Sequence, residues 1–303
     1  MEVCVIGAGG LVGLPLCRQL LAEGHKVTGV TVSSAQPENI ACSHWESGAN
    51  ALRRVFRGGE VWDVIYDLRA YHPTDLDGLV ERVSALTRHW IHVSTIYIYF
   101  RFSKTWTSAD PACPSSGPIR EDTPCNPSGD YGIGKAACEK VWFQAINRAR
   151  APVTITRLPF IYGPEDRSKR SSYYIRAIQS CQKFKLPMGG TKYIELVFSH
   201  DIAKALTRIS ENPLTIGHAL NVSVGTPTTL RAHVQAIAET IGANIDIGVE
   251  SLNPYVKERP PFAFPIDVVL DITRLRSFIG SVEPTPLLSA WKATVEVKCR
   301  EAT

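Results

Sequence analysis

The sequence of 303 residues lacks several features that define particular classes of protein. Its eight cysteines form no Cys-x-x-Cys pair and no Cys/His group at the spacing of zinc ligands, so we expect reduced thiols and no metal site. Its longest apolar runs are well short of the roughly 20 residues that cross a bilayer. Residues 1–6 already have the pattern of a buried strand, which leaves no room for a signal peptide. These absences predict a soluble, cytoplasmic protein with no membrane partner.

A strong bias towards charge of one sign is also absent. The 33 basic and 29 acidic residues give a net charge of +4, which is too weak a bias to predict nucleic-acid binding. The composition is that of an ordinary globular protein, with 44% hydrophobic and 20% charged residues, and no repeat of about 20 to 50 residues is visible. We therefore expect a small-molecule substrate as the partner.

Short β-branched runs alternate with helical patterns in the first half of the chain. Strands are predicted at residues 3–6, 26–30, 61–67, 90–95 and 153–157, and a helix at residues 11–23. This alternation predicts an α/β fold, a Rossmann-type doubly wound parallel sheet. We assign residues 1–165 to a dinucleotide-binding Rossmann domain and residues 166–303 mainly to a smaller C-terminal α/β substrate lobe, with some chain returning to the Rossmann core.

A glycine-rich turn joins the first predicted strand to the first predicted helix. Gly7 permits a tight turn, Gly10 lets the backbone approach a pyrophosphate, and Gly13 lets the helix pack closely on the strand. The helix N-terminus then favours the phosphate charge. A glycine turn without a ligand is the alternative. We predict that a dinucleotide contacts the whole turn, comprising Gly7, Gly9, Gly10, Leu11, Val12 and Gly13.

The choice between NAD and NADP depends on the end of the second strand. A carboxylate there would bind the ribose 2′-hydroxyl of NAD, but the sequence has Thr31-Val32-Ser33-Ser34. The hydroxyls of Ser33 and Ser34 accept a 2′-phosphate more easily than a carboxylate would, so we favour NADP over NAD. Arg69 is the candidate cation for that phosphate, and its alternative is an exposed arginine at the rim of the site.

Tyr131 and Lys135 lie four residues apart at the start of a predicted helix, so their side chains share one face. An ammonium group beside a phenol stabilises the phenolate, which makes the tyrosine a candidate general acid/base. The strand at residues 90–95 ends in Ser94 and Thr95, at the edge of the sheet where ligands of such folds bind. Thr95 is thereby placed to hold a carbonyl oxygen beside Tyr131. The Tyr-x-x-x-Lys spacing alone also occurs on ordinary surfaces.

Together these motifs resemble the extended short-chain dehydrogenases, also called the NAD-dependent epimerase/dehydratase family. The resemblance implies that Tyr131 is the acid/base, that Lys135 modulates its pKa and binds the ribose, and that Thr95 positions the substrate, with Ser94 as the alternative for that role. It also places Pro159 among the cofactor contacts and suggests a homodimer through helices that include the one near Tyr131. The matching segments are the glycine turn, residues 93–99, 121–124, 131–135, 157–164, 198–203, 220–223 and 270–274.

Departures from the family pattern carry information about the substrate. Sugar 4,6-dehydratases have an Asp-Glu pair directly after the threonine, whereas this chain has Ile96 and Tyr97, so we do not expect elimination chemistry. Phe160 and Ile194 stand where nucleotide-sugar enzymes carry an Asn and an Arg that hold the diphosphate. A nucleotide sugar is therefore the second choice of substrate. If Tyr97 and Phe160 face the pocket, they suit a less polar ketone or alcohol; core packing is the alternative for Phe160.

The segment that follows residues 163–164 is basic and contains Arg167 and Arg170. It is either a solvated loop or a contact for an anionic group of the substrate. Prolines 260, 261 and 265 predict a rigid loop over the cleft. His200 and Arg259 are weaker candidates for substrate contact. The substrate contacts that we predict are Ser94, Thr95, Tyr97, Phe160 and Arg167.

These features lead to one main functional prediction and two alternatives. The main prediction is an NAD(P)-dependent oxidoreductase that interconverts a ketone or other carbonyl and a secondary alcohol on a small metabolite, with Tyr131 as the general acid/base. The first alternative is a sugar or nucleotide-sugar epimerase with tightly bound NAD. The second is a non-catalytic dinucleotide sensor or RNA-binding relative, which would not need Tyr131, Lys135 and Thr95 together.

Overall fold

The computed structural model describes residues 1–31, 42, 44–47, 51–57, 59, 61–100, 117–180, 183–250, 260–264 and 266–300. Its largest sheet has seven strands, all paired in parallel, in the order β11-β6-β5-β4-β1-β2-β3. The predicted doubly wound α/β sheet is thereby confirmed. The strands are β1 (Glu2–Ile6), β2 (Lys26–Thr31), β3 (His44–Ser47), β4 (Trp62–Asp67), β5 (Thr87–Thr95), β6 (Val153–Leu158) and β11 (Ala219–Asn221).

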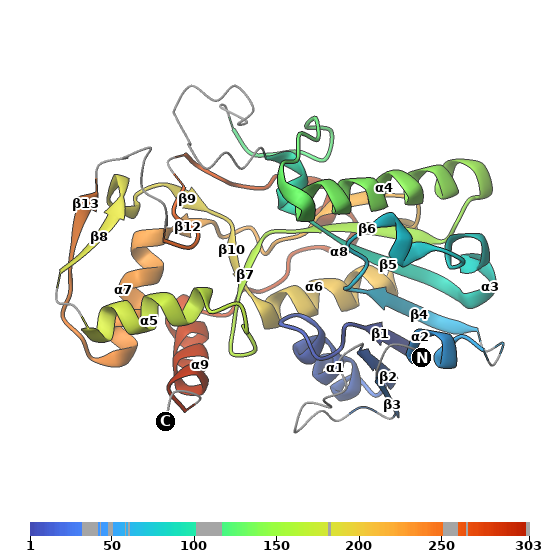
Figure 1. Cartoon of the computed structure of the whole chain (residues 1–303), viewed down its shortest axis with the longest axis horizontal. Coiled ribbons are helices and arrows are strands. Elements are labelled where there is room, and N and C mark those ends of the chain that lie inside the picture. The colour runs from blue at the N-terminus through green and yellow to red at the C-terminus, as the bar shows by residue number, and fades with distance from the viewer. Residues whose placement is uncertain are drawn as a thin grey trace.

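Helices cover both faces of this sheet (Figure 1), with α4 (Gly129–Ala149) on one face and α1 (Gly13–Ala22) and α6 (Ser199–Glu211) on the other. The side chains of β1 alternate between two hydrophobic clusters, as the period of two in a strand requires. Val3 and Val5 enter the cluster with α1 and α6, whereas Cys4 and Ile6 enter the cluster with α4. Burial on both faces explains why the strand sequences are nearly continuous apolar runs.

The remaining elements are of two kinds. Short helices flank the large sheet: α2 (Ala51–Val55), α3 (Val83–Leu86), α8 (Thr273–Ile279) and the 3-10 turns η1 (Pro73–Leu76), η2 (Val80–Arg82), η3 (Ile96–Tyr99) and η5 (Pro213–Thr215). Beside the large sheet (Figure 1) lies a smaller group, which comprises α5 (Arg170–Ser180), α7 (Leu230–Ile241), α9 (Leu287–Arg300), η4 (Met188–Gly190) and the strand pairs β7 (Phe160–Tyr162) with β10 (Leu196–Phe198), β8 (Lys183–Pro187) with β13 (Asp246–Glu250), and β9 (Tyr193–Ile194) with β12 (Thr228–Thr229).

The chain after residue 165 contributes to both parts of the molecule. It supplies β11, which pairs with β6 at the edge of the large sheet, and α6, which packs against α1. The division of the chain at residue 165 remains a prediction. Among the described residues, none of the helices combines the length and the apolar character that a membrane crossing requires.

The parallel arrangement brings the carboxyl ends of the central strands to one edge of the sheet. Ile6 at the end of β1 pairs with Asp67 at the end of β4, and Thr95 at the end of β5 pairs with Leu158 at the end of β6. The segments that leave these strands are the glycine turn and the residues from 68, 96 and 159 onwards. Segments far apart in the sequence therefore meet at the edge where ligands bind in folds of this type.

Candidate active site

A cleft of about 430 Å³ opens at this carboxyl edge. The glycine turn forms one of its walls, with Gly7 at a φ of +90°, a conformation that side chains disfavour. A Cβ atom on Gly13 would lie 2.2 Å from the carbonyl oxygen of Gly7 and 2.8 Å from the backbone of Ala8. The close approach of α1 to the turn therefore requires glycine at position 13, as the sequence indicated.

Most of the predicted cofactor contacts line this cleft. Ser33 and Ser34 lie outside the described residues. Thr31, Leu68, Tyr71 and Ile161 also line the cleft, although the sequence analysis did not select them. Their only sequence signal is their place near the carboxyl end of a large-sheet strand: Thr31 ends β2, Leu68 and Tyr71 follow β4, and Ile161 follows β6. The predicted residues found in the cleft wall are Gly7, Gly9, Gly10, Leu11, Val12, Gly13, Arg69, Lys135 and Pro159.

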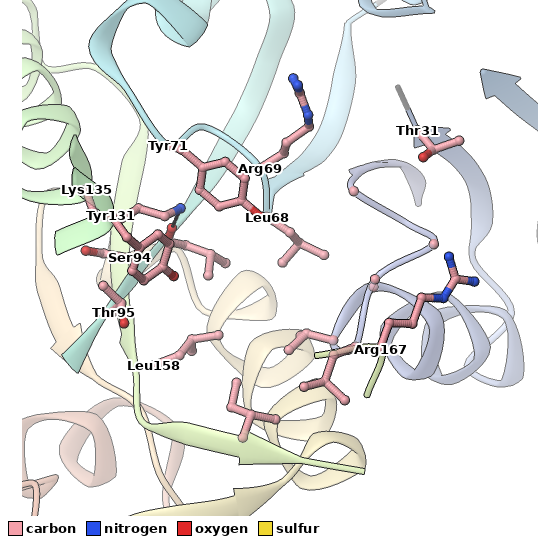
Figure 2. Close-up of a pocket in the computed structure, with 18 of the residues that line it drawn as sticks. Thr31, Leu68, Arg69, Tyr71, Ser94, Thr95, Tyr131, Lys135, Leu158 and Arg167 are labelled. Carbon is pink, nitrogen blue, oxygen red and sulfur yellow. Dashed lines mark hydrogen bonds between the residues drawn. The ribbon is translucent and has the colours of Figure 1, made fainter. Parts of the chain in front are cut away.

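The structure brings the predicted catalytic residues together at one end of the cleft. Figure 2 shows Tyr131, Lys135, Ser94 and Thr95 gathered there, whereas Thr31 lies at the opposite end. Tyr131 comes from the first turn of α4, which begins at residue 129, and Ser94 and Thr95 come from the end of β5. The polar groups needed to hold and protonate a carbonyl oxygen therefore share one wall.

The phenol of Tyr131 lies between two other aromatic rings. The centroids of Tyr71 and Tyr97 are each 5.7 Å from the Tyr131 centroid, in edge-to-face geometry. Although 45% of the Tyr131 surface is exposed, partial removal of its phenol from water raises the pKa of Tyr131 to about 12, while the hydroxyl of Thr95 and the charge of Arg170 act in the opposite direction. Tyr131 is therefore protonated at neutral pH in the chain alone, and it can donate a hydrogen bond.

Lys135 lies deeper than Tyr131, with only 1% of the residue exposed. Its Nζ donates a hydrogen bond of 2.6 Å to the carbonyl oxygen of Val93 and lies 5.0 Å from the ring centroid of Tyr71. Burial lowers the pKa of Lys135, and the carboxylate of Asp67 is the first of several negative groups that oppose this effect. The ammonium group therefore donates a hydrogen bond to the backbone of β5 and is shielded from solvent.

Two of the predicted substrate contacts, Tyr97 and Phe160, do not line the cleft. They belong to an aromatic cluster beside Tyr131, in which Tyr97 lies 5.5 Å and Phe264 4.9 Å from Phe160, measured between ring centroids. Phe160 is 1% exposed, which agrees with core packing, the alternative role considered for this residue. Phe262 also contacts Phe160, so the segment 260–264 packs on this cluster. Pro265 lies outside the described residues.

Arg170 is a site residue for which the sequence gave only a general signal. From the basic segment, Arg167 was predicted as the substrate contact. Figure 2 shows Arg167 at the end of the cleft where Thr31 lies. Arg170 is the first residue of α5, and its guanidinium carbon lies 5.1 Å from the ring centroid of Phe262. Its charge and its hydrogen bond oppose the rise in the pKa of Tyr97 that burial causes. The basic segment therefore does bring a positive charge to the aromatic cluster, but the charge is that of Arg170 and not that of Arg167.

The apolar residues that depart from the family pattern are buried in the structure. Ile96 is fully buried directly after Thr95, and Ile194 is 1% exposed. No acid therefore follows Thr95 to assist an elimination. His200, a weaker candidate, lies 3.7 Å from a carboxylate oxygen of Glu165, and Arg259 lies outside the described residues.

One group of residues in the described part of the chain could offer three atoms to a metal ion. Glu23, His25 and Glu211 place their ligand atoms within 4.8 Å of one another. Both glutamates are exposed, and none of the three residues lines the cleft. The sequence did not predict this group because Glu211 is far from Glu23 and His25 in the chain. Exposed groups of this kind are common, and we assign it no function.

Comparison with known proteins establishes the family. The sequence profile described as the NAD dependent epimerase/dehydratase family matches residues 3–225. The chain belongs to this family, whose members include the extended short-chain dehydrogenases.

Individual relatives are more distant. The chain is 25% identical over 278 residues to the UDP-glucose 4-epimerase of Mycolicibacterium smegmatis, a match that covers 80% of this chain and 83% of the relative. It is 26% identical over 242 residues to the spore coat polysaccharide biosynthesis protein SpsK of Bacillus subtilis, covering 74% of each chain.

Solved structures confirm the Rossmann-type fold over the full length. The WbmH enzyme of Bordetella bronchiseptica, solved in complex with NAD+, has a TM-score of 0.77 at 19% identity and covers 100% of this chain and 99% of that chain. MoeE5, solved with UDP-glucose and NAD, has a TM-score of 0.74 at 20% identity and covers 100% of both chains. At these identities the likeness shows the fold alone.

Proposed function

We propose that this chain is an NAD-dependent epimerase of a nucleotide sugar, which oxidises a secondary alcohol of the sugar and reduces the resulting ketone on its other face. The observation that carries the proposal is the meeting of Tyr131, Thr95 and Lys135 at one end of a cleft whose wall is the glycine turn. The family and the likeness to UDP-glucose 4-epimerase support the sugar substrate. The main prediction from the sequence was an oxidoreductase of a small carbonyl compound. The family and the relatives support the epimerase alternative better than this main prediction.

The residues of the cleft suit a dinucleotide. Gly13 leaves no room for a Cβ atom, and Gly7 holds the positive φ that keeps the turn tight, so the backbone of the turn is open to a pyrophosphate. The same turn, with Arg69 and Pro159, would hold the cofactor. When bound, NAD supplies the hydride acceptor for oxidation and the hydride for reduction.

The chain's own residues supply the proton chemistry. Thr95 orients the substrate oxygen through its hydroxyl, and Tyr131 takes the proton of the alcohol and returns it to the ketone oxygen. Because the pKa of Tyr131 is about 12, its phenolate needs stabilisation by nearby positive charge. Arg170 provides one such charge, and we assign the same role to the ammonium group of Lys135, one helical turn from Tyr131. Ile96 and Tyr97 provide no acid for the loss of water, so the ketone is reduced again and not dehydrated.

We also propose NAD, and not NADP, as the cofactor. The solved relatives named above are complexes with NAD, and the comparisons give no support to the preference for NADP inferred from Ser33 and Ser34. Arg69 lines the cleft and would suit a 2′-phosphate, so the proposal is open to a direct test. Dissociation constants measured for both dinucleotides should be lower for NAD, and a tighter complex with NADP would contradict the proposal.

Net oxidation or reduction of a smaller carbonyl compound is the second candidate. One observation favours it: Phe160 and Ile194 are each 1% exposed and apolar at the positions where contacts to a diphosphate are expected. A substrate without a diphosphate would not miss those contacts. This candidate uses the same roles for Tyr131, Lys135 and Thr95.

The experiment that separates the two candidates begins with the purified chain. Mass spectrometry identifies any nucleotide that copurifies, and UDP-glucose is then added while NMR follows the sugar and ultraviolet absorbance follows NADH. Our proposal predicts bound NAD and formation of the C4 epimer without net NADH. Stoichiometric NADH without an epimer would favour the second candidate, and the absence of both products with NAD bound would contradict the epimerase with this substrate.

A further inference from the structure

The proposed function has not used a second buried charge, that of Asp67 on the strand beside the Lys135 contact. Asp67 pairs in register with His92, and Nζ of Lys135 donates its 2.6 Å hydrogen bond to the carbonyl oxygen of the next residue, Val93. Asp67 is the last residue of β4 and is only 2% exposed. Its Oδ1 accepts backbone N–H groups from Arg69 at 3.0 Å and Ala70 at 2.9 Å, and its Oδ2 lies 3.2 Å from Nδ1 of His92. The carboxylate is therefore fixed on both oxygens.

The hydrogen bonds determine the charge of this pair. Burial opposes ionisation of Asp67, but the hydrogen bond and charge of His92, the charge of Lys135 and the backbone N–H of Ala70 hold the pKa of Asp67 below its usual value. Burial lowers the pKa of His92, so its imidazole is neutral at neutral pH and its Nδ1–H donates to Asp67. The pair thus carries one negative charge.

Lys135 needs a negative charge in its surroundings. It is 1% exposed, and an ammonium group taken out of water loses its proton more readily unless a counter-charge is present. Glu139 is an unsuitable counter-ion because it is already paired with Arg157, with 2.7 Å between Oε2 and the guanidinium nitrogen. Asp75 accepts two backbone N–H groups, at 2.8 and 3.0 Å, and is partly exposed. The titratable groups around Lys135 are Asp67 from β4, His92 from β5, Tyr71 and Asp75 from the segment 71–76, and Tyr131, Cys138 and Glu139 from α4.

We propose that Asp67 is a positioning residue whose buried carboxylate keeps Lys135 protonated, and that His92 holds this carboxylate in place. The consequence for catalysis rests on the role proposed for Lys135, because only a charged lysine stabilises the phenolate of Tyr131. The electrostatic coupling itself is a property of the chain without cofactor or substrate. The two can therefore be tested separately.

The test follows the protonation of Lys135 directly. The chain is prepared with lysine carrying ¹³C at the ε-carbon, the Lys135 signal is assigned with Lys135→Met, and its chemical shift is recorded against pH. Asp67→Asn removes the charge, but its amide oxygen can still accept the N–H groups of Arg69 and Ala70. His92→Phe removes the hydrogen bond but leaves the charge, and a phenyl ring suits a site 6.1 Å from Trp142.

Asp67→Asn should lower the pH at which Lys135 titrates by at least about one unit. His92→Phe should change it by much less, because Asp67 remains ionised at the alkaline pH where a lysine titrates. Asp63→Asn, on the same strand beside Arg88, is the control for loss of a partly exposed carboxylate and should have no effect. If Asp67→Asn does not fold, Asp67→Ser takes its place. An unchanged titration in the Asp67 variant, or an equal shift in His92→Phe, would overturn the inference.

NAD affinity measured against pH separates this inference from the proposed function. If Lys135 binds the cofactor as proposed, the alkaline loss of NAD affinity should move to lower pH in Asp67→Asn by the amount seen in the NMR titration. A shift in the titration without any change in NAD affinity would leave the coupling intact and contradict the proposed role of Lys135. No shift in the titration would overturn the coupling whatever the NAD affinity shows.

Discussion

At the scale of single residues, the site depends on the balance between burial and charge. The phenol of Tyr131 has a pKa of about 12 in the chain alone, so its environment by itself does not produce a base at neutral pH. The hydroxyl of Thr95 and the charge of Arg170 favour the phenolate. We propose that Lys135 does so as well, with its own charge supported by the buried carboxylate of Asp67. In this proposal the acid/base tyrosine is controlled by Lys135 of α4, Arg170 of α5, Asp67 of β4 and Thr95 of β5.

Gly13→Ala should damage both the turn and the cofactor site. The new Cβ would lie 2.2 Å from the carbonyl oxygen of Gly7, so α1 must move away from β1. We expect a loss of about 1 to 3 kcal/mol in the free energy of unfolding and NAD binding weaker by at least about tenfold, which is about 1.4 kcal/mol. Urea unfolding and NAD titration measure the two effects. Gly248→Ala, where the nearest atom is 3.7 Å away, is the control; equal results for both variants would contradict our account.

The sequence predicted some of these residues and could not predict others. Tyr131 and Lys135 are four residues apart on one helix, and Gly7 and Gly13 belong to one turn, so local spacing was sufficient. Asp67 and His92 meet only because β4 and β5 pair in one particular register, which the sequence does not state. Arg170 was not separated from its basic neighbours because its contact with Phe262 joins segments that are distant in the chain.

At the scale of elements, α4 joins the proposed catalytic residues to the core. Tyr131, Lys135 and Glu139 follow one another at intervals of four residues and so lie on one face of the helix. Glu139 and Arg157 of β6 form a buried ion pair, and Arg157 also donates to the hydroxyl of Tyr99 at 2.7 Å. The face of α4 that carries Tyr131 and Lys135 is therefore fixed to β6 one turn further along the helix.

The contact between α7 and α9 makes the stability of the protein sensitive to acid. Trp291 donates a hydrogen bond of 3.0 Å to Nδ1 of His233, which is 1% exposed, and burial lowers the pKa of His233 to about 3. An unfolded chain has histidine with a pKa of about 6.5. As the pH falls between these values, only the unfolded chain takes up the proton, so His233 makes the folded state progressively less stable.

His233→Gln should reduce this acid sensitivity. Glutamine keeps an oxygen that can accept from Trp291 but cannot be protonated in this range. The free energy of unfolding, measured by urea at a series of pH values from neutral to about pH 4, should fall less steeply in the variant than in the parent chain. Some slope should remain, because burial also lowers the pKa of His89, to about 4. An equal slope in the two proteins would contradict the assignment to His233.

At the scale of the whole molecule, one edge of one sheet collects the site. The strands β1, β2, β4, β5 and β6 were predictable because each has its own run of apolar residues, whereas the short strands β3 and β7 were not predicted. The placement of β11 beside β6 and of α6 against α1 could not be predicted. Both elements follow long connections, and their sequence patterns do not indicate which strand or helix they pack against. Ser33 and Ser34, on which the preference for NADP depended, lie outside the described residues.

The most direct test of the account is the rate at which bound NAD is reduced when UDP-glucose is mixed with the enzyme in a single turnover. Tyr131→Phe should lower this rate by about 100-fold or more without weakening NAD binding, because the phenol moves the proton and does not hold the cofactor. Tyr173→Phe, at a partly exposed position on α5, is the matched control and should react like the parent chain. An undiminished rate in Tyr131→Phe, with NAD bound normally, would contradict the assignment of Tyr131 as the general acid/base.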